Sequence, residues 1–499
     1  MAPKKIYTGA ALLGLLTLGV FIFLKEGSMK SKQIDVVRTS FRKIEQFPDP
    51  TEINTSGKWY LLNHISSPLI EYSHKTSSFK PLIASTWEIN DSIYTFHLNP
   101  LAKFSDGSMI KPSDVGQSIK RILVKKKSTH FPLWNHVKGC DQLNNMNQNC
   151  DGLSWDDDKN IVTVKLKGKS DSFLLQISSP ESGIWAALDI DSECNLAPTK
   201  YSGPYSLEGL KVDTNKEFIL NRNSNSILQT EFPSSPNKIV VKSMERSEIE
   251  KAIVDGNADI FIGDFIPYND FDWEQMKVGI HYTTPSSIIY FFGLNSEKKI
   301  GQDLLASLAT VPEKRLLRAD TFLPFAPEVA LNQTDYAEAL PLKSSRILKV
   351  AAPGFYFKDQ ALEFLKSAAQ KIGIDLEVTK IERAEYFELV TSKEDFKSKY
   401  DFLLGSYVAS ERYPAVQLRF LTGERQSPVN LSDVEQPDQD PVKIKRLKDY
   451  QKWLLKSQTV VPIYFMRSHI VSAPYIDVGD QPITDADIQL WRLTKKDAQ

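Results

Sequence analysis

The segment from residue 347 to residue 407 alternates strand patterns with helix patterns, and this alternation limits the possible folds more than any other feature of the sequence. "ILKVAA" and "IDLEVT" each predict a strand, and "YDFLLGS" (400–406) predicts a third. The helix between the first two strands has one apolar face, made by Leu362, Leu365, Ala369 and Ile372. Gly373 follows it as a stop signal, and residues 384–396 predict a second helix. A β-α-β-α-β run of this spacing predicts a parallel, doubly wound α/β sheet.

Aromatic residues follow two of these predicted strands. Phe355 and Tyr356 come after the first strand, and Ser406 with Tyr407 comes at the end of the third. Open sheets of this class bind ligands beyond the carboxyl ends of their strands, so two neighbouring loops would present aromatic faces to a ligand. The alternative is that these residues only pack within their own loops.

A second unit extends from residue 81 to residue 168 and has a different pattern. Apolar residues alternate on both sides of an Asn90-Asp91 turn, which predicts a hairpin. The period then changes to that of a helix, with Pro112 at a favoured first position. A second hairpin turns at "DDDKN", where we expect a solvated turn rather than a cation site. We interpret this unit as hairpins around one helix.

Composition excludes some classes of function. The chain has 499 residues, a length at which about three domains are expected. Apolar residues make up 41% and charged residues 25%, values typical of globular proteins. The 61 basic and 62 acidic residues nearly cancel, so no excess positive charge is available for a nucleic-acid partner.

The N-terminus resembles a membrane segment. Two lysines precede an uncharged run from Ile6 to Leu24, which at about 1.5 Å per residue would nearly span a ~30 Å bilayer core. Its end, "VFIFLKEGS", is a poor cleavage site, and no cysteine nearby could carry a lipid. We therefore expect residues 1–30 to be an inner-membrane anchor with the body in the periplasm. The alternatives are a cleaved signal, which would leave a soluble periplasmic protein, and a buried helix.

The three cysteines are Cys140, Cys150 and Cys194, and no C-x-x-C pair accompanies them. Cys140 and Cys150 flank a polar loop that a disulfide would close in an oxidising compartment. Free thiols are the alternative. If the body lies outside the cytoplasm, we expect the Cys140–Cys150 disulfide and a free Cys194.

Enzyme signatures are missing from the sequence. It contains no phosphate-binding glycine loop, H-E-x-x-H, G-x-S-x-G or dinucleotide fingerprint. His97 falls in a predicted hairpin strand, where a structural role is expected. We therefore expect a non-catalytic protein without a cofactor or a metal site.

The order of short motifs resembles the family-five extracytoplasmic solute-binding proteins, the dipeptide- and oligopeptide-binding components of ATP-binding-cassette importers. The similar segments, in order, are "SSPLIEY", "PLIASTWEINDSIYTFHLNPLAKFSDGSMIKPSDVGQSIKRIL", "YSGPYSLEGL", "IIYFFGLNSEKK", "QKIGIDLEV" and "VVPIYF". Each is weak alone, and their shared order over residues 34–471 carries the resemblance. A membrane-anchored sensor or assembly factor that kept the fold and lost transport is the alternative.

The resemblance implies a two-lobed fold of the type II periplasmic-binding-protein kind, with an extra hairpin subdomain. Lobe one would comprise residues 31–244 and 442–499, with the hairpin subdomain at 55–168, and lobe two residues 245–441. Two crossing segments would form a hinge. A peptide or related solute would bind between the lobes, and importer permease subunits would be the protein partners of a monomer. The candidate ligand-binding residues are Phe41, Tyr290, Phe355, Tyr356, Ser406, Tyr407, Ser410, Glu411 and Arg412.

One loop departs from the family pattern. Some family members have a W-x-A-D-Y-type loop whose aspartate pairs with a peptide's terminal amine, and here the sequence is "GSYVASERYP". Ser410 cannot supply that charge. Glu411 could reach inward, whereas Arg412 would favour an anionic group, and the two could also pair with each other. We therefore predict that a free peptide amine is not held as it is in relatives.

Overall fold

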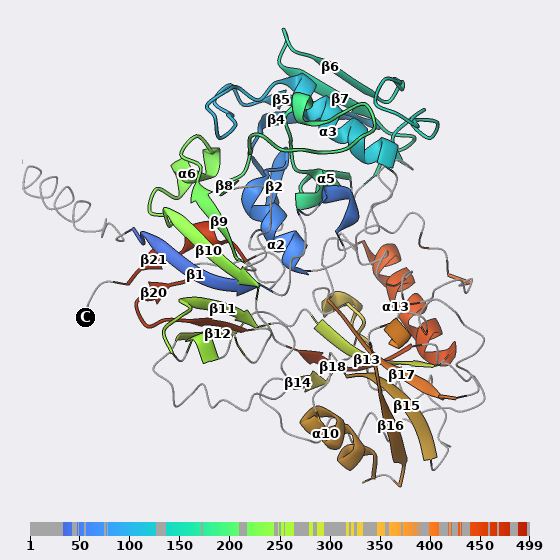
Figure 1. The fold of residues 1–499 in the computed structure, drawn as a ribbon. Coiled ribbons are helices and arrows are strands. Elements are labelled where there is room, and N and C mark those ends of the chain that lie inside the picture. The colour runs from blue at the N-terminus through green and yellow to red at the C-terminus, as the bar shows by residue number, and fades with distance from the viewer. Residues whose placement is uncertain are drawn as a thin grey trace, which may run out of the picture.

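Two large β-sheets organise the protein into an upper and a lower body (Figure 1), described here from a computed structural model. The structure describes residues 33–41, 47, 49–53, 56–73, 76, 78–125, 136–170, 173–208, 217–243, 248, 251–253, 255–263, 279–282, 287–293, 316–318, 321–323, 327–332, 347–354, 359–370, 373–382, 384–386, 389, 399–408, 418, 421, 428–429, 431, 440–457, 460–466, 469–479 and 488–496. The predicted anchor, residues 6–24, lies outside these residues.

The helices are spread over both bodies. Together with the short 3-10 helices (η), they are η1 (Pro50–Glu52), α2 (Ser56–Ile65), α3 (Pro112–Lys125), α5 (Phe173–Ile177), η2 (Pro180–Ser182), η3 (Ala187–Asp189), α6 (Ile227–Glu231), η4 (Pro327–Val329), α10 (Asp359–Gln370), α13 (Pro441–Ser457) and η6 (Leu490–Arg492). In the lower body α10 packs on the sheet near β16, and α13 packs near β18. Leu362, Leu365 and Ala369 of the predicted apolar face are buried, whereas Ile372 lies outside the described residues. Gly373 has a φ of +77°, as a helix stop requires.

A seven-stranded sheet forms the core of the upper body, in the order β12-β19-β11-β1-β10-β9-β8. Its strands are β1 (Val36–Phe41), β8 (Tyr205–Glu208), β9 (Glu217–Arg222), β10 (Lys238–Ser243), β11 (Ile260–Gly263), β12 (Gly279–Tyr282) and β19 (His469–Ser472). β1 is parallel to β10 and β11, and β19 runs antiparallel to β11 and β12. Two short pairs flank this body, β2 (Ile70–Ser73) with β3 (Ser78–Pro81) and β20 (Ile476–Asp477) with β21 (Thr494–Lys495).

A six-stranded sheet forms the core of the lower body, in the order β14-β18-β13-β17-β15-β16. Its strands are β13 (Ser287–Gly293), β14 (Leu316–Arg318), β15 (Ile347–Pro353), β16 (Asp375–Ile381), β17 (Phe402–Val408) and β18 (Val460–Met466). The β-α-β-α-β prediction gave three neighbouring parallel strands, β16, β15 and β17. The sheet as a whole is mixed, because β13 is antiparallel to both β17 and β18.

The sheets do not follow the expected lobe boundaries. β11 and β12 lie inside 245–441 but belong to the upper sheet, and β18 lies inside 442–499 but belongs to the lower sheet. The chain therefore passes from one large sheet to the other at two places, after β12 and after β18. Strand pairing between distant segments sets these boundaries, and a local sequence pattern does not contain that information.

The predicted hairpin unit is a four-stranded antiparallel sheet in the order β4-β5-β7-β6. Its strands are β4 (Ala84–Asn90), β5 (Ile93–Leu98), β6 (Leu153–Asp156) and β7 (Ile161–Lys165). Asp91 and Asn160 occupy the turns with φ of 54° and 58°, a conformation that Asp and Asn tolerate well. α3 covers the inner face and buries the predicted apolar stripe, namely Val115, Ile119, Ile122 and Leu123.

The acidic "DDDKN" turn caps the helix of this unit. Asp157 accepts hydrogen bonds from the backbone N–H and the hydroxyl of Ser113, at 2.7 and 2.9 Å. Asp156 accepts from its own turn at Lys159. A carboxylate at a helix N-terminus is favourable because unpaired N–H groups and the helix dipole point there. The turn is thus a structural cap, in keeping with the solvated turn that we expected.

A buried ion pair joins the four-stranded unit to the upper body. Arg121 of α3 is 2% exposed and binds both carboxylate oxygens of Asp49, at 2.9 and 2.5 Å. Its Nε donates to the Cys194 carbonyl at 2.9 Å. Burial alone would raise the pKa of Asp49, but the hydrogen bonds and charge of Arg121, together with the hydrogen bonds from Thr51, outweigh burial and lower it.

The cysteines stabilise the same unit. Cys140 and Cys150 form a disulfide with a Cα–Cα distance of 5.0 Å. Lys120 of α3 donates to Asn149 Oδ1 at 3.1 Å and so ties the disulfide loop to the helix. Cys194 is a buried free thiol, and burial raises its pKa.

The C-terminal segment packs on α2 through a buried histidine. His64 Nδ1 lies 2.7 Å from the Tyr60 carbonyl, and Nε2 accepts from the Leu490 N–H at 3.1 Å. A carbonyl can only accept, so Nδ1 carries the proton and the ring is neutral. Burial lowers the pKa of His64 to about 4, in agreement with this state.

Candidate functional site

The carboxyl ends of the parallel strands in both sheets converge on the two crossings. In the upper sheet, Tyr282 at the end of β12 and Gly263 at the end of β11 both lie opposite His469. In the lower sheet, Ser287 at the start of β13 lies opposite both Val408 and Met466, the last residues of β17 and β18. The sheet edges at which α/β proteins bind ligands therefore face the connection between the bodies.

Four of the predicted ligand residues lie in strands of the two large sheets, three of them at or near these edges and Tyr290 in the middle of its strand. Phe41 is the last residue of β1 and pairs with Ser243 of β10. Tyr290 lies in β13 opposite Gly405. The predicted strand ended at Ser406, but β17 continues to Val408, so the prediction of Tyr407 in the following loop was wrong. Pairing with β13 extends the strand beyond the apolar run that defined it in sequence.

The remaining predicted ligand residues belong to the two loops that follow β15 and β17. Phe355, Tyr356, Ser410, Glu411 and Arg412 lie outside the described residues. The strands before these loops are described, and β15 and β17 are parallel neighbours with Val350 opposite Phe402. The two loops therefore leave the sheet at the same edge, as the sequence predicted.

Two buried aspartates hold the parallel strands of this site in register. Asp259 precedes β11 and accepts from the backbone N–H of Arg38 in β1 at 2.6 Å, while its own N–H donates to the Arg38 carbonyl at 2.8 Å. Asp401 precedes β17 and makes the same pair of bonds to Lys349 in β15, at 2.9 and 2.8 Å. Sequence reasoning missed this role, although both segments, "ADIFIG" and "YDFLLG", place an aspartate directly before an apolar strand.

The aspartate of the upper sheet has further partners. Tyr475 donates its hydroxyl to Asp259 Oδ1 at 2.5 Å, and Arg38 Nε lies 3.3 Å from Oδ2. Burial raises the pKa of Tyr475 to about 12, and the hydrogen bond to Asp259 acts in the same direction. The Tyr475 hydroxyl thus stays protonated and donates at all physiological pH values.

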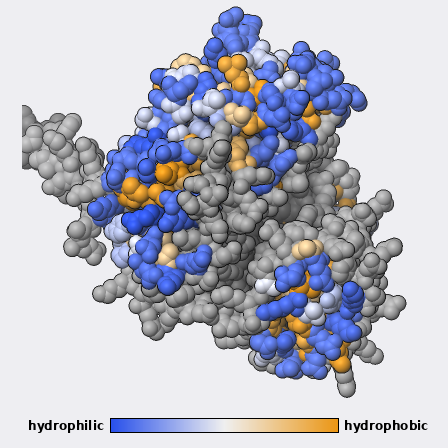
Figure 2. All heavy atoms as spheres, viewed as in Figure 1, coloured by the Kyte–Doolittle hydropathy of each residue, from blue (hydrophilic) through white to orange (hydrophobic). Residues whose placement is uncertain are grey.

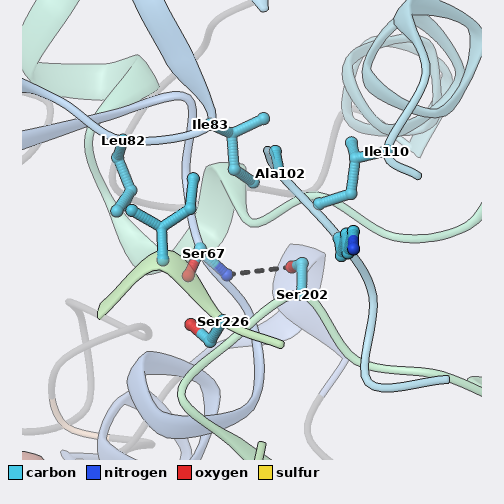
Figure 3. A pocket seen from close by; sticks show the side chains of 9 residues that line it. Ser67, Leu82, Ile83, Ala102, Ile110, Ser202 and Ser226 are labelled. Atoms are coloured by element: carbon cyan, nitrogen blue, oxygen red, sulfur yellow. Dashed lines mark hydrogen bonds between the residues drawn. The ribbon is translucent and has the colours of Figure 1, made fainter. Parts of the chain in front are cut away.

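A small pocket lies away from the strand edges and is lined by residues that precede β4, β8 and α6 and by Ala102, Lys103 and Ile110 between β5 and α3 (Figure 3). Its cavity volume is about 10 Å³, and its lining includes Leu82, Ile83, Ser202 and Ser226. The Ser67 N–H donates to the Ser202 hydroxyl at 3.0 Å across it. Small-molecule sites usually enclose about 300–1,000 Å³, so this pocket is too small for a peptide.

Two other kinds of site were searched for in the described part of the chain. No cluster of His, Cys, Asp and Glu there has the arrangement of a metal site. Among the same residues, none of the helices is long and apolar enough to cross a membrane.

Comparison with known proteins relates this chain to one class of binding proteins. The family model "Bacterial extracellular solute-binding proteins, family 5 Middle" matches residues 78–307. The matched residues lie within the segment whose motifs resemble this family, and the match supports that resemblance.

Individual relatives are distant and cover nearly the whole chain. The periplasmic murein peptide-binding protein MppA of Escherichia coli (strain K12) is 20% identical over 516 residues, covering 91% of this chain and 92% of MppA. NikA from Brucella suis, solved with Fe(III)-EDTA, has a TM-score of 0.70 at 16% identity and covers 92% of this chain and 100% of its own. Listeria monocytogenes OppA bound to peptide has a TM-score of 0.64 at 14% identity, covering 93% and 100%. At these identities the structural matches show the fold alone.

Proposed function

We propose that this protein is the extracytoplasmic substrate-binding component of an ATP-binding-cassette importer and binds a peptide or a related small solute. The observation that carries the proposal is the convergence of the parallel strand ends of both sheets on the two crossings. The match to the family model and the names of MppA and OppA suggest the class of ligand.

The proposed lobes follow the sheets. Lobe one comprises residues 33–282 and 469–496, and lobe two comprises residues 287–466. The two crossings begin and end at neighbouring strand residues, because Tyr282 pairs with His469 in one sheet and Ser287 pairs with Met466 in the other. Rotation of one lobe about this pair of neighbouring connections closes the protein on its ligand. The ligand shifts the population to the closed state because only that state lets it contact both lobes.

The proposed ligand contacts come from both lobes. Phe41 lies on the lobe-one edge, and Ser406 and Tyr407 lie near the lobe-two edge, with Tyr290 further along β13. Exposed backbone at these edges pairs with an extended peptide as an added strand does, which gives affinity with little dependence on peptide sequence. Phe355 and Tyr356 contact the ligand from the loop after β15.

The end group of the ligand distinguishes this protein from peptide binders that use an aspartate. The loop after β17 offers Ser410, Glu411 and Arg412, and none of them is an aspartate. A charge-assisted bond to a terminal ammonium contributes roughly 1.5–3 kcal/mol, or about ten- to hundredfold in affinity. We propose that the free amine contributes less than this here, and that Arg412 favours an anionic group instead.

The proposed location is the periplasm, with residues 6–24 as an inner-membrane anchor and the importer permease as the partner of a monomer. The Cys140–Cys150 disulfide supports an oxidising compartment. Fractionation of host cells after salt and carbonate washes tests the anchor. Recovery of a soluble periplasmic body whose N-terminus begins near residue 30 would show a cleaved signal instead.

Calorimetry with a random tripeptide pool and its N-acetylated counterpart tests the proposed function. We expect binding, with affinities for the two pools that differ by less than tenfold. Tight binding of the free pool that acetylation abolishes, and that Glu411→Ala leaves intact, would show that another residue holds the amine. Absence of binding to both pools, together with no co-purifying solute in native mass spectrometry, would contradict the solute-binding proposal itself.

A further inference from the structure

The small pocket of Figure 3 lies where two apolar clusters of the upper body meet. Leu82 belongs to the cluster of the seven-stranded sheet, and its neighbour Ile83 belongs to the cluster of the four-stranded unit. Ile227 packs against both clusters. The outer surface of the four-stranded unit is mainly hydrophilic (Figure 2), whereas most residues that line the pocket are buried. Hydrogen bonds made inside the pocket would therefore join the two parts of the upper body.

One wall of the pocket consists of polar groups that are already paired. The Ser67 N–H donates to the Ser202 hydroxyl at 3.0 Å, and this hydroxyl donates to the Ile184 carbonyl at 2.5 Å. The Ile184 N–H donates in turn to the Ser67 carbonyl at 2.9 Å. These bonds use both backbone groups of Ser67 and fix the position of its hydroxyl.

Two hydroxyls at the pocket have no hydrogen-bond partner among the described residues. They belong to Ser67 and Ser226, which both line the pocket and are each 3% exposed. Ser226 is the N-cap of α6, where a serine hydroxyl ordinarily accepts from a backbone N–H of the helix, but here it makes no such bond. A buried hydroxyl without a partner is unfavourable, and most buried polar groups in proteins have one. The pocket provides the space for a partner of both hydroxyls.

The size and the lining of the pocket decide what this partner is. Its volume of about 10 Å³ is close to the smallest space that holds one water molecule. Buried waters typically make two to four hydrogen bonds to polar groups that otherwise lack partners, and a hydroxyl can donate or accept. None of the residues that line the pocket is acidic, so a metal cation would have no counter-charge. Lys103 is the one ionisable residue of the lining, which makes a halide ion the competing occupant.

We propose that the pocket holds one ordered water molecule that bridges the Ser67 and Ser226 hydroxyls. The water ties the segment after α2 to the start of α6, at the place where the two apolar clusters meet. It supplies the hydrogen bond that the N-cap serine of α6 does not make to its own helix. This water is a structural component of the upper body, and the inference is independent of the proposed solute site.

Guanidinium unfolding of the full chain tests the bridge through a double-mutant cycle of Ser67→Ala and Ser226→Ala. Either substitution removes one end of the bridge, so the second substitution has little left to remove. We expect each single variant to lower the folding equilibrium constant roughly fivefold or more. The double variant should then stay within about twofold of the less stable single variant, although the two serines share no direct hydrogen bond.

Ser178→Ala provides the matched control for this cycle. Its hydroxyl is also buried but donates to the Leu175 carbonyl at 2.8 Å. When Ser178→Ala is combined with Ser226→Ala, the fold-changes of the two single variants should multiply. If the fold-changes multiply in the cycle of Ser67 and Ser226 as well, the bridge is overturned.

Crystallography of the full chain and of its Ser226→Ala variant identifies the occupant. We expect one peak of solvent density within about 2.5–3.0 Å of both hydroxyl oxygens, and the loss or displacement of this peak in the variant. An anomalous peak at this position in crystals soaked with bromide would show a halide ion beside Lys103 instead of water. A direct hydrogen bond between Ser67 and Ser226, or density that contacts only one of the two hydroxyls, would also overturn the proposal.

Discussion

Gly203→Ala should destabilise the upper body by several kcal/mol, because the backbone passes too close to the end of α2 for any side chain. A Cβ at this position would lie 2.5 Å from Ile65 C and from Ser66 N, and 2.7 Å from the His64 carbonyl oxygen. All three atoms are backbone, so no rotamer change relieves the clash. Ordinary contact at about 3.4 Å requires a displacement of roughly 0.9 Å between the two segments.

The size of the effect follows from the bonds that this displacement breaks. The Gly203 N–H donates to the Ile65 carbonyl at 3.1 Å, and the Ser67 N–H donates to the neighbouring Ser202 at 3.0 Å. Two buried hydrogen bonds at about 1 kcal/mol each, with an overpacking cost of about 1–3 kcal/mol, give a loss of roughly 3–5 kcal/mol.

Guanidinium unfolding followed by circular dichroism measures this loss, with Gly168→Ala as the matched control. A Cβ at Gly168 meets nothing within 4 Å. That variant should therefore stay within about 0.5 kcal/mol of the parent protein or gain slightly from a stiffer unfolded chain. Equal midpoints for Gly203→Ala and Gly168→Ala would refute the close-approach argument.

Three further predictions concern buried polar groups. Asp49→Asn leaves Arg121 buried without a counter-charge and should cost about 3–5 kcal/mol of unfolding free energy; a loss below 1 kcal/mol would contradict the burial of this pair. His64 has a native pKa of about 4, below its ordinary 6.5, so its contribution is complete above pH 6.5 and falls by on the order of 3 kcal/mol as pH drops through 4. The slope of stability against pH in this window should flatten in His64→Gln, and an unchanged slope would exclude the histidine as its source. Gln451→Leu removes the acceptor of the Thr321 hydroxyl and the Phe322 N–H, at 2.7 and 2.8 Å. It should reduce the stability of the lower body, measured by hydrogen exchange, by about 2–4 kcal/mol. Unchanged exchange rates would contradict a role for these hydrogen bonds.

Local features of the fold were predictable because they depend on neighbouring residues. The alternation around Asn90-Asp91 defined a hairpin, and the apolar spacing after Pro112 defined a helix, and both are present. The three parallel strands of the lower sheet were predictable for the same reason, since each is an apolar run separated by a helix.

Long-range pairing was not predictable from these patterns. "VVPIYF" is recognisable as a strand, but its sequence does not show that it pairs with β13 and β14 in the lower sheet. The extension of β17 to Val408 likewise depends on β13 beside it. At the candidate site, the edge of the sheet was predictable, whereas the register-setting roles of Asp259 and Asp401 required the paired strands to be seen.

The distance between the two bodies, with and without ligand, tests the central claim most directly. Spin labels at Ile89→Cys in the four-stranded unit and Ile347→Cys in β15 occupy sites that are 48% and 50% exposed, one in each body. Electron–electron resonance on the full chain measures the distance distribution before and after saturation with the tripeptide pool. We predict that peptide binding produces a second, distinct population of distances between the two labels, because the lobes close. An unchanged distribution, under conditions where calorimetry shows the peptide to be bound, would contradict a ligand held between closing lobes.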